Sequence, residues 1–485
     1  MINATDFHTY YQLVECPRRL WLDANRPDLK APPSEFDQLL FRKGREHEQA
    51  HLATFSEYAR PAYRPGDLAA GAAATARLLS EGTAVIYQGV LMSPDRGLAG
   101  IPDFLIREGD TYLVREVKLA LNLDRHPEIP AQIGLYSHIL QTGHGVSVPR
   151  GEVLLGNGEL VLLDPIAIGD LVGRLAAIKA TPDEPDEAVG WSKCQPCAFF
   201  DYCWNAAIQA RDPAVVAGIE QGLRHALLRA GIRRYDGLAT VGVDQLADMR
   251  FQQKTRERKV GEKTAEKVLR QVAVLMSGQM QIVCPPQLPS AGPVVYFDIE
   301  SNPLEADLDP IVYLWGLLVD RAGRAAPEYW GGIASPGTEG DASAWQAFLA
   351  KAADVFRELG DVPFVHYAAY EKTWTRKYIE RWGDRDGIGE RVLGRLVDLY
   401  PTITGSLCLP VHSYGLKQVE KYAGFQRQQV DYGSLWSVAR YNAYLETADE
   451  AERKAIEGEL LTYNEEDCVA MRHVLKWAAR LRRGA

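Results

Sequence analysis

Apolar positions along this chain of 485 residues fall into short β-branched runs and longer stretches with helical spacing. The run VVYFDI begins at Val294, directly after CPPQLPSAGP (Cys284 to Pro293), which contains four prolines. This abrupt change predicts a linker followed by a buried strand. Near the C-terminus, LLTYNEEDCVAMRHVLKWAARL has apolar residues at helical spacing and predicts a long helix.

The first part of the chain has a different pattern. In GIPDFLIREGDTYLVREVKLA, around residue 100, two strand-like runs flank the turn REGD and predict a hairpin. FRKGREHEQAHL and AQIGLYSHILQ predict helices, and residues 218–276 read as short helices interrupted by glycine. A softer boundary lies near Ala206 to Pro213. We therefore expect an α/β multidomain protein with parts at 1–208, 209–283 and 294–485.

Composition is that of an ordinary soluble protein, with 46% hydrophobic and 24% charged residues and no apolar run long enough to cross a bilayer. The N-terminal sequence lacks the pattern of a signal peptide, so we expect a cytoplasmic protein whose seven cysteines are ligands or free thiols. The formal net charge of −10 excludes a wholly basic nucleic-acid-binding surface. It leaves local basic patches and metal-dependent nucleases open.

Acidic residues interrupt the apolar pattern of the last part. Asp298 and Glu300 are two residues apart on the predicted strand, so both side chains leave the same face. Two carboxylates on an apolar strand are costly unless cations compensate them, and a pair of divalent metals would do so. On the late helix, Tyr463 and Asp467 are four residues apart and point the same way.

D-x-E on a first strand with Y-x3-D on a late helix resembles the tyrosine subclass of the DnaQ-like DEDD exonucleases. The resemblance implies a ribonuclease H-like fold, 3′-to-5′ exonuclease activity and four acids that bind two Mg²⁺ or Mn²⁺ ions, while the tyrosine orients the attacking water. In the family the middle acid is commonly an aspartate. Here the matching stretch, FVHYAAYEKTWTRKY, supplies Glu371, and Asp398 is interpreted as a structural acid at a strand end.

The hairpin near residue 100 carries a second set of charges. Asp103 lies near the start of its first strand, and Glu116 and Lys118 alternate with Val117 on its second. Two acids can hold a divalent metal there, and an ammonium group can position and activate water beside a phosphate. An amphipathic hairpin with a solvated charged face explains the spacing equally well.

Together, G-x-x-H, PD, E-x-K and Q-x-x-x-Y resemble the RecB-like branch of the PD-(D/E)XK nucleases, which have a restriction-endonuclease-like fold. The resemblance implies that His47, Asp103 and Glu116 ligate the metal and that Lys118 is catalytic. It also implies that Gln132 and Tyr136 help to bind DNA. His51 has no role in the motif and is interpreted as a packing or surface residue.

Three cysteines lie close together in CQPCAFFDYC: Cys194, Cys197 and Cys203. With Cys16 far upstream, they resemble the cysteines of the iron–sulfur nucleases of the CRISPR-associated RecB-like exonuclease type. The resemblance implies a [4Fe-4S] cluster that clamps the two ends of the nuclease domain. Four thiolates would also suit zinc, so spacing alone does not name the metal. The remaining cysteines, Cys284, Cys408 and Cys468, are isolated in the sequence and are interpreted as ordinary thiols that bind no metal.

The middle part contains VGEKTAEKV, which resembles the glycine-containing turn of a helix-hairpin-helix module. From Arg250 to Arg270 there are eight Lys or Arg residues and three Glu residues, a local basic excess in an acidic chain. Arg256, Lys259 and Lys263 are therefore expected to bind the DNA backbone without reading sequence. A basic helical spacer between two domains is the alternative.

The order of the three parts resembles RecB-like nucleases of bacteria. It predicts a metal-dependent DNA nuclease with two phosphodiesterase sites that acts on single-stranded ends in processing, repair or defence. A nucleic-acid-binding adaptor with inactive sites and an RNA-directed exonuclease are the alternatives. The chain has no G-x-x-x-x-G-K-[ST] phosphate loop, so we expect any unwinding to come from a separate helicase.

Overall fold

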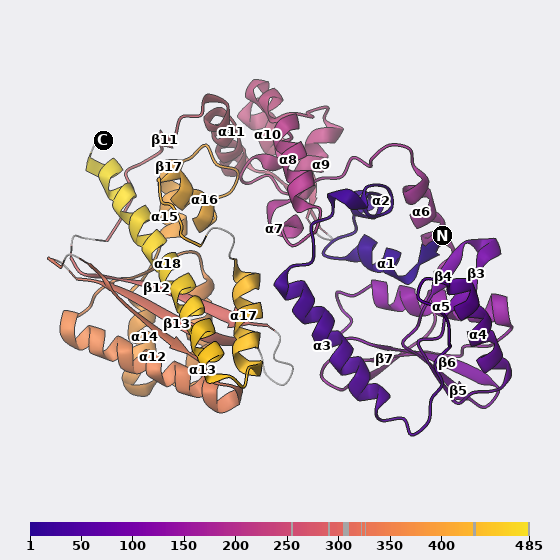
Figure 1. Ribbon diagram of the computed structural model, residues 1–485. Coiled ribbons are helices and arrows are strands. Elements are labelled where there is room, and N and C mark those ends of the chain that lie inside the picture. The colour runs from indigo at the N-terminus through magenta and orange to yellow at the C-terminus, as the bar shows by residue number, and fades with distance from the viewer. Residues whose placement is uncertain are drawn as a thin grey trace. The chain divides into compact units, whose positions relative to one another are not determined.

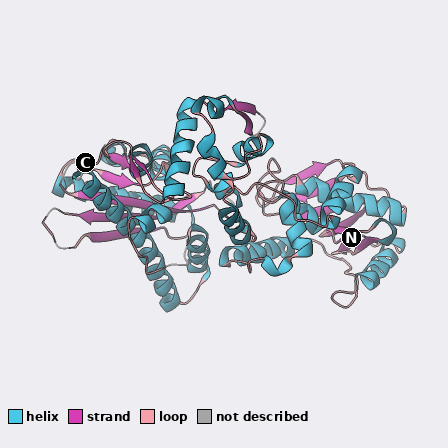
Figure 2. Ribbon diagram, turned by 90° about the horizontal axis from the view of Figure 1, so that it is seen from above, coloured by secondary structure: helices cyan, strands magenta, loops and turns pink. Residues whose placement is uncertain are grey.

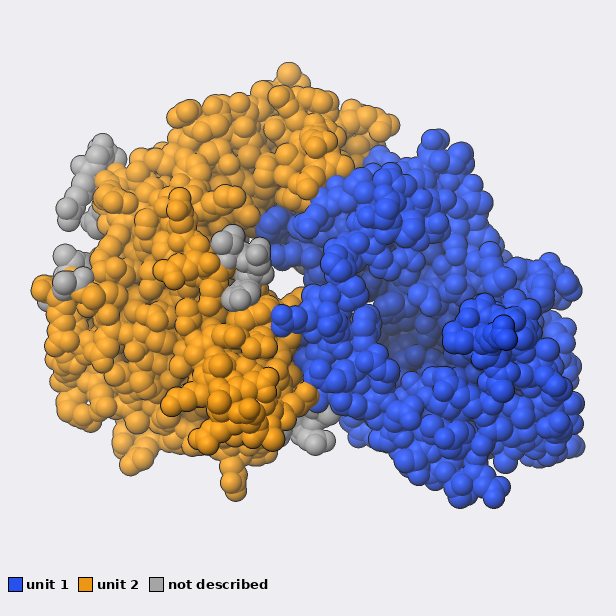
Figure 3. All heavy atoms as spheres, in the orientation of Figure 1, with its two compact units in different colours: residues 1–203 blue, residues 204–485 orange. Residues whose placement is uncertain are grey.

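The computed structural model describes residues 1–253, 256–289, 292–303, 310–321, 323–324, 326–429 and 433–483. The chain divides into two compact units, unit 1 (Met1–Cys203) and unit 2 (Trp204–Ala485) (Figure 3). Both units mix helices and strands, as the α/β prediction requires (Figure 2). Ser290 and Ala291 of the predicted linker lie outside the described residues. In the described ranges, no helix combines the length and apolar character needed to span a membrane.

Unit 1 contains a five-stranded and a three-stranded sheet. The larger sheet consists, in spatial order, of β2 (Val85–Tyr87), β5 (Phe104–Glu108), β6 (Thr111–Val117), β7 (Gly151–Leu154) and β8 (Leu160–Leu163), and the smaller one of β1 (Ile2–Asn3), β4 (Leu98–Gly100) and β3 (Leu91–Ser93). β5 and β6 are antiparallel and joined by Gly109 and Asp110, which confirms the predicted hairpin. β6 and β7 are parallel, so the chain crosses over between them.

The helices of unit 1 include both helices expected from the sequence. They are α1 (Ala4–Tyr11), α2 (Pro17–Asn25), α3 (Glu35–Leu52), α4 (Leu68–Ser80), α5 (Glu128–His144), α6 (Gly169–Ala180), α7 (Trp191–Cys194) and α8 (Phe200–Ala210), the last of which extends into unit 2. α3 begins at a capping box, in which Ser34 and Asp37 each accept the other's backbone N–H. α5 supplies the crossover between β6 and β7.

Alternating side chains cover the two faces of the larger sheet in unit 1. Leu105 and Ile86 face the core that α5 buries, where Ile133 and Leu140 are fully buried. Phe104 belongs to a second cluster with Leu52 of α3 on the opposite face. The sheet is therefore packed on both sides, which fixes the register of the hairpin and the positions of its charged residues.

Unit 2 contains a five-stranded mixed sheet (Figure 1). Its strands are, in spatial order, β14 (Glu328–Ile333), β13 (Ile311–Asp320), β12 (Val294–Asn302), β15 (Phe364–His366) and β16 (Leu396–Asp398). β12, β13 and β14 are antiparallel neighbours, whereas β15 runs parallel to β12 and β16 runs parallel to β15. The predicted buried strand is confirmed as β12, which lies at the centre of this sheet.

The helices around this sheet include the long C-terminal helix expected from the sequence. They are α12 (Gly337–Leu359), α13 (Tyr370–Trp382), α14 (Ile388–Leu393), α15 (Leu399–Ser406), α16 (Leu416–Tyr422), α17 (Ser434–Glu446) and α18 (Glu450–Arg483). Phe297 of β12 stacks on Phe348 of α12, with ring centroids 5.2 Å apart. Tyr296, one residue earlier, packs with Cys468 and Met471 of α18. Every second residue of β12 therefore faces α18.

The first part of unit 2 is helical and carries a β-hairpin. Its elements are α9 (Gln221–Arg229), α10 (Val243–Asp248), β9 (Arg250–Gln253), β10 (Arg256–Lys259), α11 (Glu262–Ser277) and β11 (Gln281–Ile282), and β11 pairs with β17 (Leu407–Cys408). Gln271 of α11 donates its side-chain N–H to the Leu409 carbonyl at 2.7 Å. These contacts explain why the structure groups residues 209–283 with the C-terminal part of the chain.

Candidate functional site

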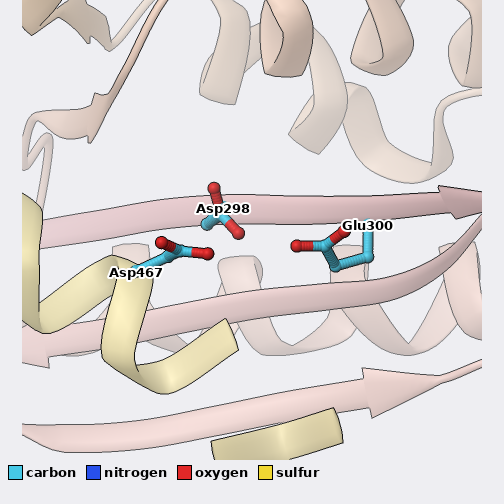
Figure 4. A group of neighbouring side chains, drawn as sticks. All are labelled: Asp298, Glu300 and Asp467. Carbon is cyan, nitrogen blue, oxygen red and sulfur yellow. The ribbon is translucent and has the colours of Figure 1, made fainter. Parts of the chain in front are cut away.

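Three carboxylates meet between the central strand and the C-terminal helix of unit 2. Asp298 and Glu300 project from the same face of β12, and Asp467 projects from α18 toward them (Figure 4). One oxygen of each lies within 4.8 Å of the others, and Glu300 and Asp467 are each only 8% exposed. Within the described ranges, this is the one group of three or more such side chains whose ligand atoms are so close together.

The environment of these acids opposes three negative charges. Burial and the charges of Asp467 and Glu300 raise the pKa of Asp298 well above its ordinary value. Burial and the charge of Asp467 raise the pKa of Glu300 to about 8. Burial also raises the pKa of Asp467, although Arg427 opposes that shift. An oxygen-only donor set of this kind fits Mg²⁺ or Mn²⁺, whose charge would stabilise the ionised carboxylates.

Two side chains that sequence reasoning did not select position these acids. Asn464 donates its side-chain N–H to Asp298, with Nδ2 and Oδ2 2.7 Å apart, and accepts a hydrogen bond from the Tyr329 hydroxyl at 2.9 Å. Gly316 allows this approach, because a Cβ atom there would lie 1.6 Å from the Asn464 oxygen. Ser437 of α17 donates to Glu300 at 3.1 Å. Asn464 had a sequence signal, since it lies inside the Y-x3-D motif.

A buried arginine also reaches this site. Arg427, in the segment between α16 and α17, donates from Nη2 to Asp467 Oδ1 at 2.5 Å and from Nε to Glu420 Oε1 at 2.5 Å. Glu466 accepts the backbone N–H of Gln428 at 2.5 Å and so ties this segment to α18. No pattern in the sequence connects Arg427 with Asp467, because the contact depends on the path of residues 423–429, which form no helix or strand.

Tyr463 lies one helical turn before Asp467 and is 3% exposed. Burial and the charges of Glu300 and Asp467 raise the pKa of its hydroxyl above the ordinary value, so the phenol keeps its proton. Its ring lies 5.6 Å from the ring of Trp436, centroid to centroid. The position agrees with the expectation that Tyr463 and Asp467 point the same way.

The middle acid of the predicted set stands apart from the three carboxylates. Glu371 of α13 is buried, pairs with His366 at 3.1 Å between Oε2 and Nδ1, and contributes to the raised pKa of Asp298. Its role as a metal ligand stays a prediction. Asp398 caps α15 and accepts the backbone N–H groups of Ala368 and Tyr400 at 2.9 Å each. These contacts match its interpretation as a structural acid.

In unit 1, the hairpin gathers the predicted acids and lysine. Asp103 accepts the backbone N–H of Val117 at 2.8 Å, and its own N–H donates to Glu116 at 3.1 Å. Lys118 Nζ donates to Glu116 Oε2 at 2.5 Å. Burial and the charge of Glu116 raise the pKa of Asp103 to about 8. All three line a cleft with a volume of about 770 Å³, which Gln132 and Tyr136 also line.

The two histidines of α3 lie differently from this group. The His47 ring contacts the Leu155 carbonyl, with Nε2 and O 3.1 Å apart, and His47 is not among the residues that line the cleft. Its role as a metal ligand stays a prediction. The next residue, Glu48, contributes to the pKa values of both Asp103 and Lys118. His51 packs against Phe104, with ring centroids 5.1 Å apart, as expected for a packing residue.

The four predicted cluster cysteines line a single small cavity in unit 1. Burial raises the pKa of Cys16 to about 11 and of Cys203 to about 12, and it also raises that of Cys194. These thiols would therefore hold their protons at neutral pH unless a metal replaced them. Cys284, Cys408 and Cys468 belong to unit 2 and lie outside this cavity.

The basic segment of unit 2 has a β-ribbon that the sequence did not reveal. β9 and β10 form an antiparallel hairpin between α10 and α11, and Gly261, with φ +78°, precedes α11. Arg256, Lys259 and Lys263 are all exposed, and Lys259 pairs with Asp248 at 2.6 Å. Lys254, which belongs to the same basic stretch, lies outside the described residues.

Comparison with known proteins supports the ribonuclease H-like fold that was expected for the last part of the chain. A family model described as the RNase_H superfamily matches residues 295–479. These residues contain the five-stranded sheet, the three gathered carboxylates and Tyr463. The C-terminal domain is therefore ribonuclease H-like, and this suggests a nuclease-type function in nucleic-acid processing. No curated protein matches the chain.

Proposed function

We propose that the chain is a metal-dependent nuclease whose unit 2 removes nucleotides from single-stranded DNA in the 3′-to-5′ direction. The observation that carries this proposal is the convergence of Asp298, Glu300 and Asp467 within 4.8 Å, in a ribonuclease H-like domain. Three acids held this closely, two of them buried, are suited to binding divalent cations.

In unit 2, the acids and Tyr463 have separate roles. Asp298, Glu300 and Asp467 would hold Mg²⁺ or Mn²⁺, with Glu371 as a further ligand, and two such ions supply charge stabilisation for the attacking and leaving oxygens. Asn464 and Ser437 keep Asp298 and Glu300 in position. The Tyr463 hydroxyl, which stays protonated, orients the attacking water by a hydrogen bond.

Unit 1 carries a second phosphodiesterase site in this proposal. Asp103 and Glu116, with His47 as the third predicted ligand, would hold a divalent metal. Lys118, paired with Glu116, presents a positive charge beside the scissile phosphate. Gln132 and Tyr136 line the same cleft and would contact the DNA strand.

The cysteines of unit 1 hold a [4Fe-4S] cluster in this proposal. Cys16, Cys194, Cys197 and Cys203 line one cavity, which suits four thiolate ligands to one group. The cluster links the N-terminus of unit 1 to its last helix.

The exposed basic residues Arg256, Lys259 and Lys263 would hold the backbone of the DNA strand. A separate helicase is the partner that would supply single strands. A nucleic-acid-binding adaptor with inactive sites is less favoured, because a binding role does not require three acids, two of them buried, at one point.

Digestion of 5′- and 3′-labelled DNA and RNA strands with Mg²⁺ or Mn²⁺ tests the proposal. Wild type is compared with Lys118→Ala and Asp298→Ala, all purified without oxygen. Each substitution should remove a different product ladder, and the labels give both polarities. If RNA is cut faster than DNA, the substrate is RNA. If the protein binds nucleic acid without cutting it, the adaptor function is favoured.

A further inference from the structure

The cleft of unit 1 is lined by titratable side chains in addition to the two acids and the lysine of the proposed site. Seven titratable side chains line it, from α1, the hairpin, the loop before α5 and α5 itself: His8, Asp103, Glu116, Lys118, His126, Glu128 and Tyr136. Hydrolysis of a phosphodiester there, which rests on the function proposed above, needs a group that takes a proton from the attacking water.

Four of these seven groups are poorly suited to accept that proton. Asp103 and Glu116 are the proposed metal ligands. Burial lowers the pKa of Lys118, but the charges of Glu116 and Asp103 outweigh that effect and raise it above its ordinary value, so the amine stays an ammonium ion. Burial raises the pKa of Tyr136 well above its ordinary value, so the phenol is also protonated. His8, His126 and Glu128 remain.

His126 and Glu128 form an oriented pair. His126 Nδ1 lies 2.9 Å from Glu128 Oε1, and Glu128 is buried at the first residue of α5. The His126 carbonyl accepts the backbone N–H of Ile129 at 3.1 Å, which fixes the turn that precedes the helix. With the Nδ1 proton donated to the carboxylate, the lone pair of the neutral imidazole is on Nε2. The His126 side chain is 40% exposed, so a water molecule can reach it.

His8 of α1 lines the same cleft but is not oriented in this way. Burial lowers its pKa, while the charge of Glu128 opposes this shift and Lys118 reinforces it. In the described part of the chain, no carboxylate lies within hydrogen-bonding distance of its ring. The groups that interact with His126 are Glu128 of α5 and His8 of α1, and Lys118, which follows β6, lines the same cleft.

We propose that His126, oriented by Glu128, is the general base of the unit 1 site. Its Nε2 takes a proton from the attacking water as the water oxygen bonds to phosphorus and the bond from phosphorus to the leaving oxygen breaks. The leaving oxygen takes a proton from solvent water, and the imidazolium returns its proton to solvent. In this mechanism Lys118 contributes only a fixed positive charge, and His126 accepts the proton.

The test uses the full chain with Asp298→Ala, which removes the unit 2 activity. Rates of cutting a single-stranded oligonucleotide with saturating Mg²⁺ are measured from acidic to alkaline pH. The rate should fall toward acidic pH, because an imidazolium at His126 has no lone pair with which to accept a proton. His126→Ala should lower the rate by about 10²–10⁴-fold and remove that acidic limb.

Added imidazole should restore part of the His126→Ala rate, an effect that a purely structural histidine would not show. Glu128→Gln should lower the rate and leave the melting temperature near that of the parent. His138→Ala is the matched control, because His138 lies on α5 outside the cleft, beside Arg96. Its rate should equal that of the parent.

Two results would overturn the assignment. One is a His126→Ala rate equal to the parent's, and the other is a loss of rate without imidazole rescue and with the acidic limb intact. If the Asp298→Ala chain cuts nothing, or Lys118→Ala changes nothing in that chain, the proposed nuclease activity of unit 1 is itself refuted. The proposed role of His126 as a general base is then refuted as well.

Discussion

Asn464 of α18 holds Asp298 of β12 through a hydrogen bond of 2.7 Å, and Tyr329 of β14 holds Asn464 in turn. The chain of contacts joins the C-terminal helix to two strands of the sheet. It orients an acid whose negative charge is opposed by burial and by its neighbours. The orientation of Asp298 therefore depends on Asn464 and Tyr329 as well as on β12 itself.

Asn464→Ala should lower unit 2 cutting by about tenfold or more, a factor that corresponds to about 1.4 kcal/mol. The substitution frees Asp298 to rotate and leaves the Tyr329 hydroxyl without its acceptor. Single-turnover cutting in a Lys118→Ala chain measures the effect. Asn442→Ala is the control, because Asn442 is also buried but donates to the Val438 carbonyl of its own helix. Equal losses in the two variants would contradict a positioning role for Asn464.

Arg427→Gln should lower the free energy of unfolding by about 3–5 kcal/mol, because it leaves buried acids without their cation. The Arg427 side chain is 7% exposed, and its partners Glu420 and Asp467 are 4% and 11% exposed. Arg440→Gln should lower the free energy of unfolding by less than about 1 kcal/mol, because the pair of Arg440 with Glu459 is more exposed. Denaturant unfolding measures both. A small effect at Arg427 would show that its pairs are not buried in solution.

Without divalent metal, the stability of the protein should fall as pH rises from the ordinary glutamate value of 4.5 to about 8. Because the pKa of Glu300 is raised on folding, the folded state binds protons more tightly than the unfolded state, and the penalty is complete only above the raised value. Thermal unfolding in a chelator should show this slope. Glu300→Gln should flatten it, and so should Mg²⁺. A slope that Glu300→Gln leaves unchanged would mean that other groups cause it.

Cys197→Ser should bleach the brown colour expected of the anaerobically purified protein and destabilise residues 1–203. Loss of one thiolate opens the proposed link between the N-terminus and the end of unit 1. Visible absorbance, iron content and limited proteolysis measure the change. Cys284→Ser, at an exposed and isolated thiol, should change none of them. A colourless wild type that contains zinc would contradict the cluster.

Arg256→Ala and Lys263→Ala should weaken DNA binding about equally for all sequences. Each should also reduce the slope of log affinity against log salt by about 1. Lys259→Ala should have a smaller effect, because Asp248 already offsets its charge. Fluorescence anisotropy over a salt series measures this. Arg385, exposed and outside the basic segment, is the control. A change at one sequence only would contradict backbone binding.

Local sequence predicted the elements of the unit 2 site well, for a simple geometric reason. Alternation on a strand places Asp298 and Glu300 on one face, and a spacing of four on a helix aligns Tyr463 with Asp467. Both relations depend only on the backbone of one element. The partners Ser437 and Arg427 could not be predicted in this way, because they come from segments that only packing brings to the acids.

The same distinction holds in unit 1 and in the basic segment. The hairpin and the Glu116–Lys118 alternation followed from the pattern, and α3 formed as expected around His47. The contact of His47 with the Leu155 carbonyl depends on how α3 packs on the sheet, which the helix itself does not determine. The ribbon of β9 and β10 was missed, because charged residues have no apolar alternation to indicate a strand.

The sequence by itself determined which elements form and which side chains share a face, since both follow from local backbone geometry and hydrophobic period. Tertiary structure alone decided that Asp467 meets Asp298 and Glu300, and that His126 shares a cleft with Lys118. Packing of the sheet and helices creates these sites by bringing distant residues together. Burial then shifts their pKa values, an effect that spacing along the chain cannot produce.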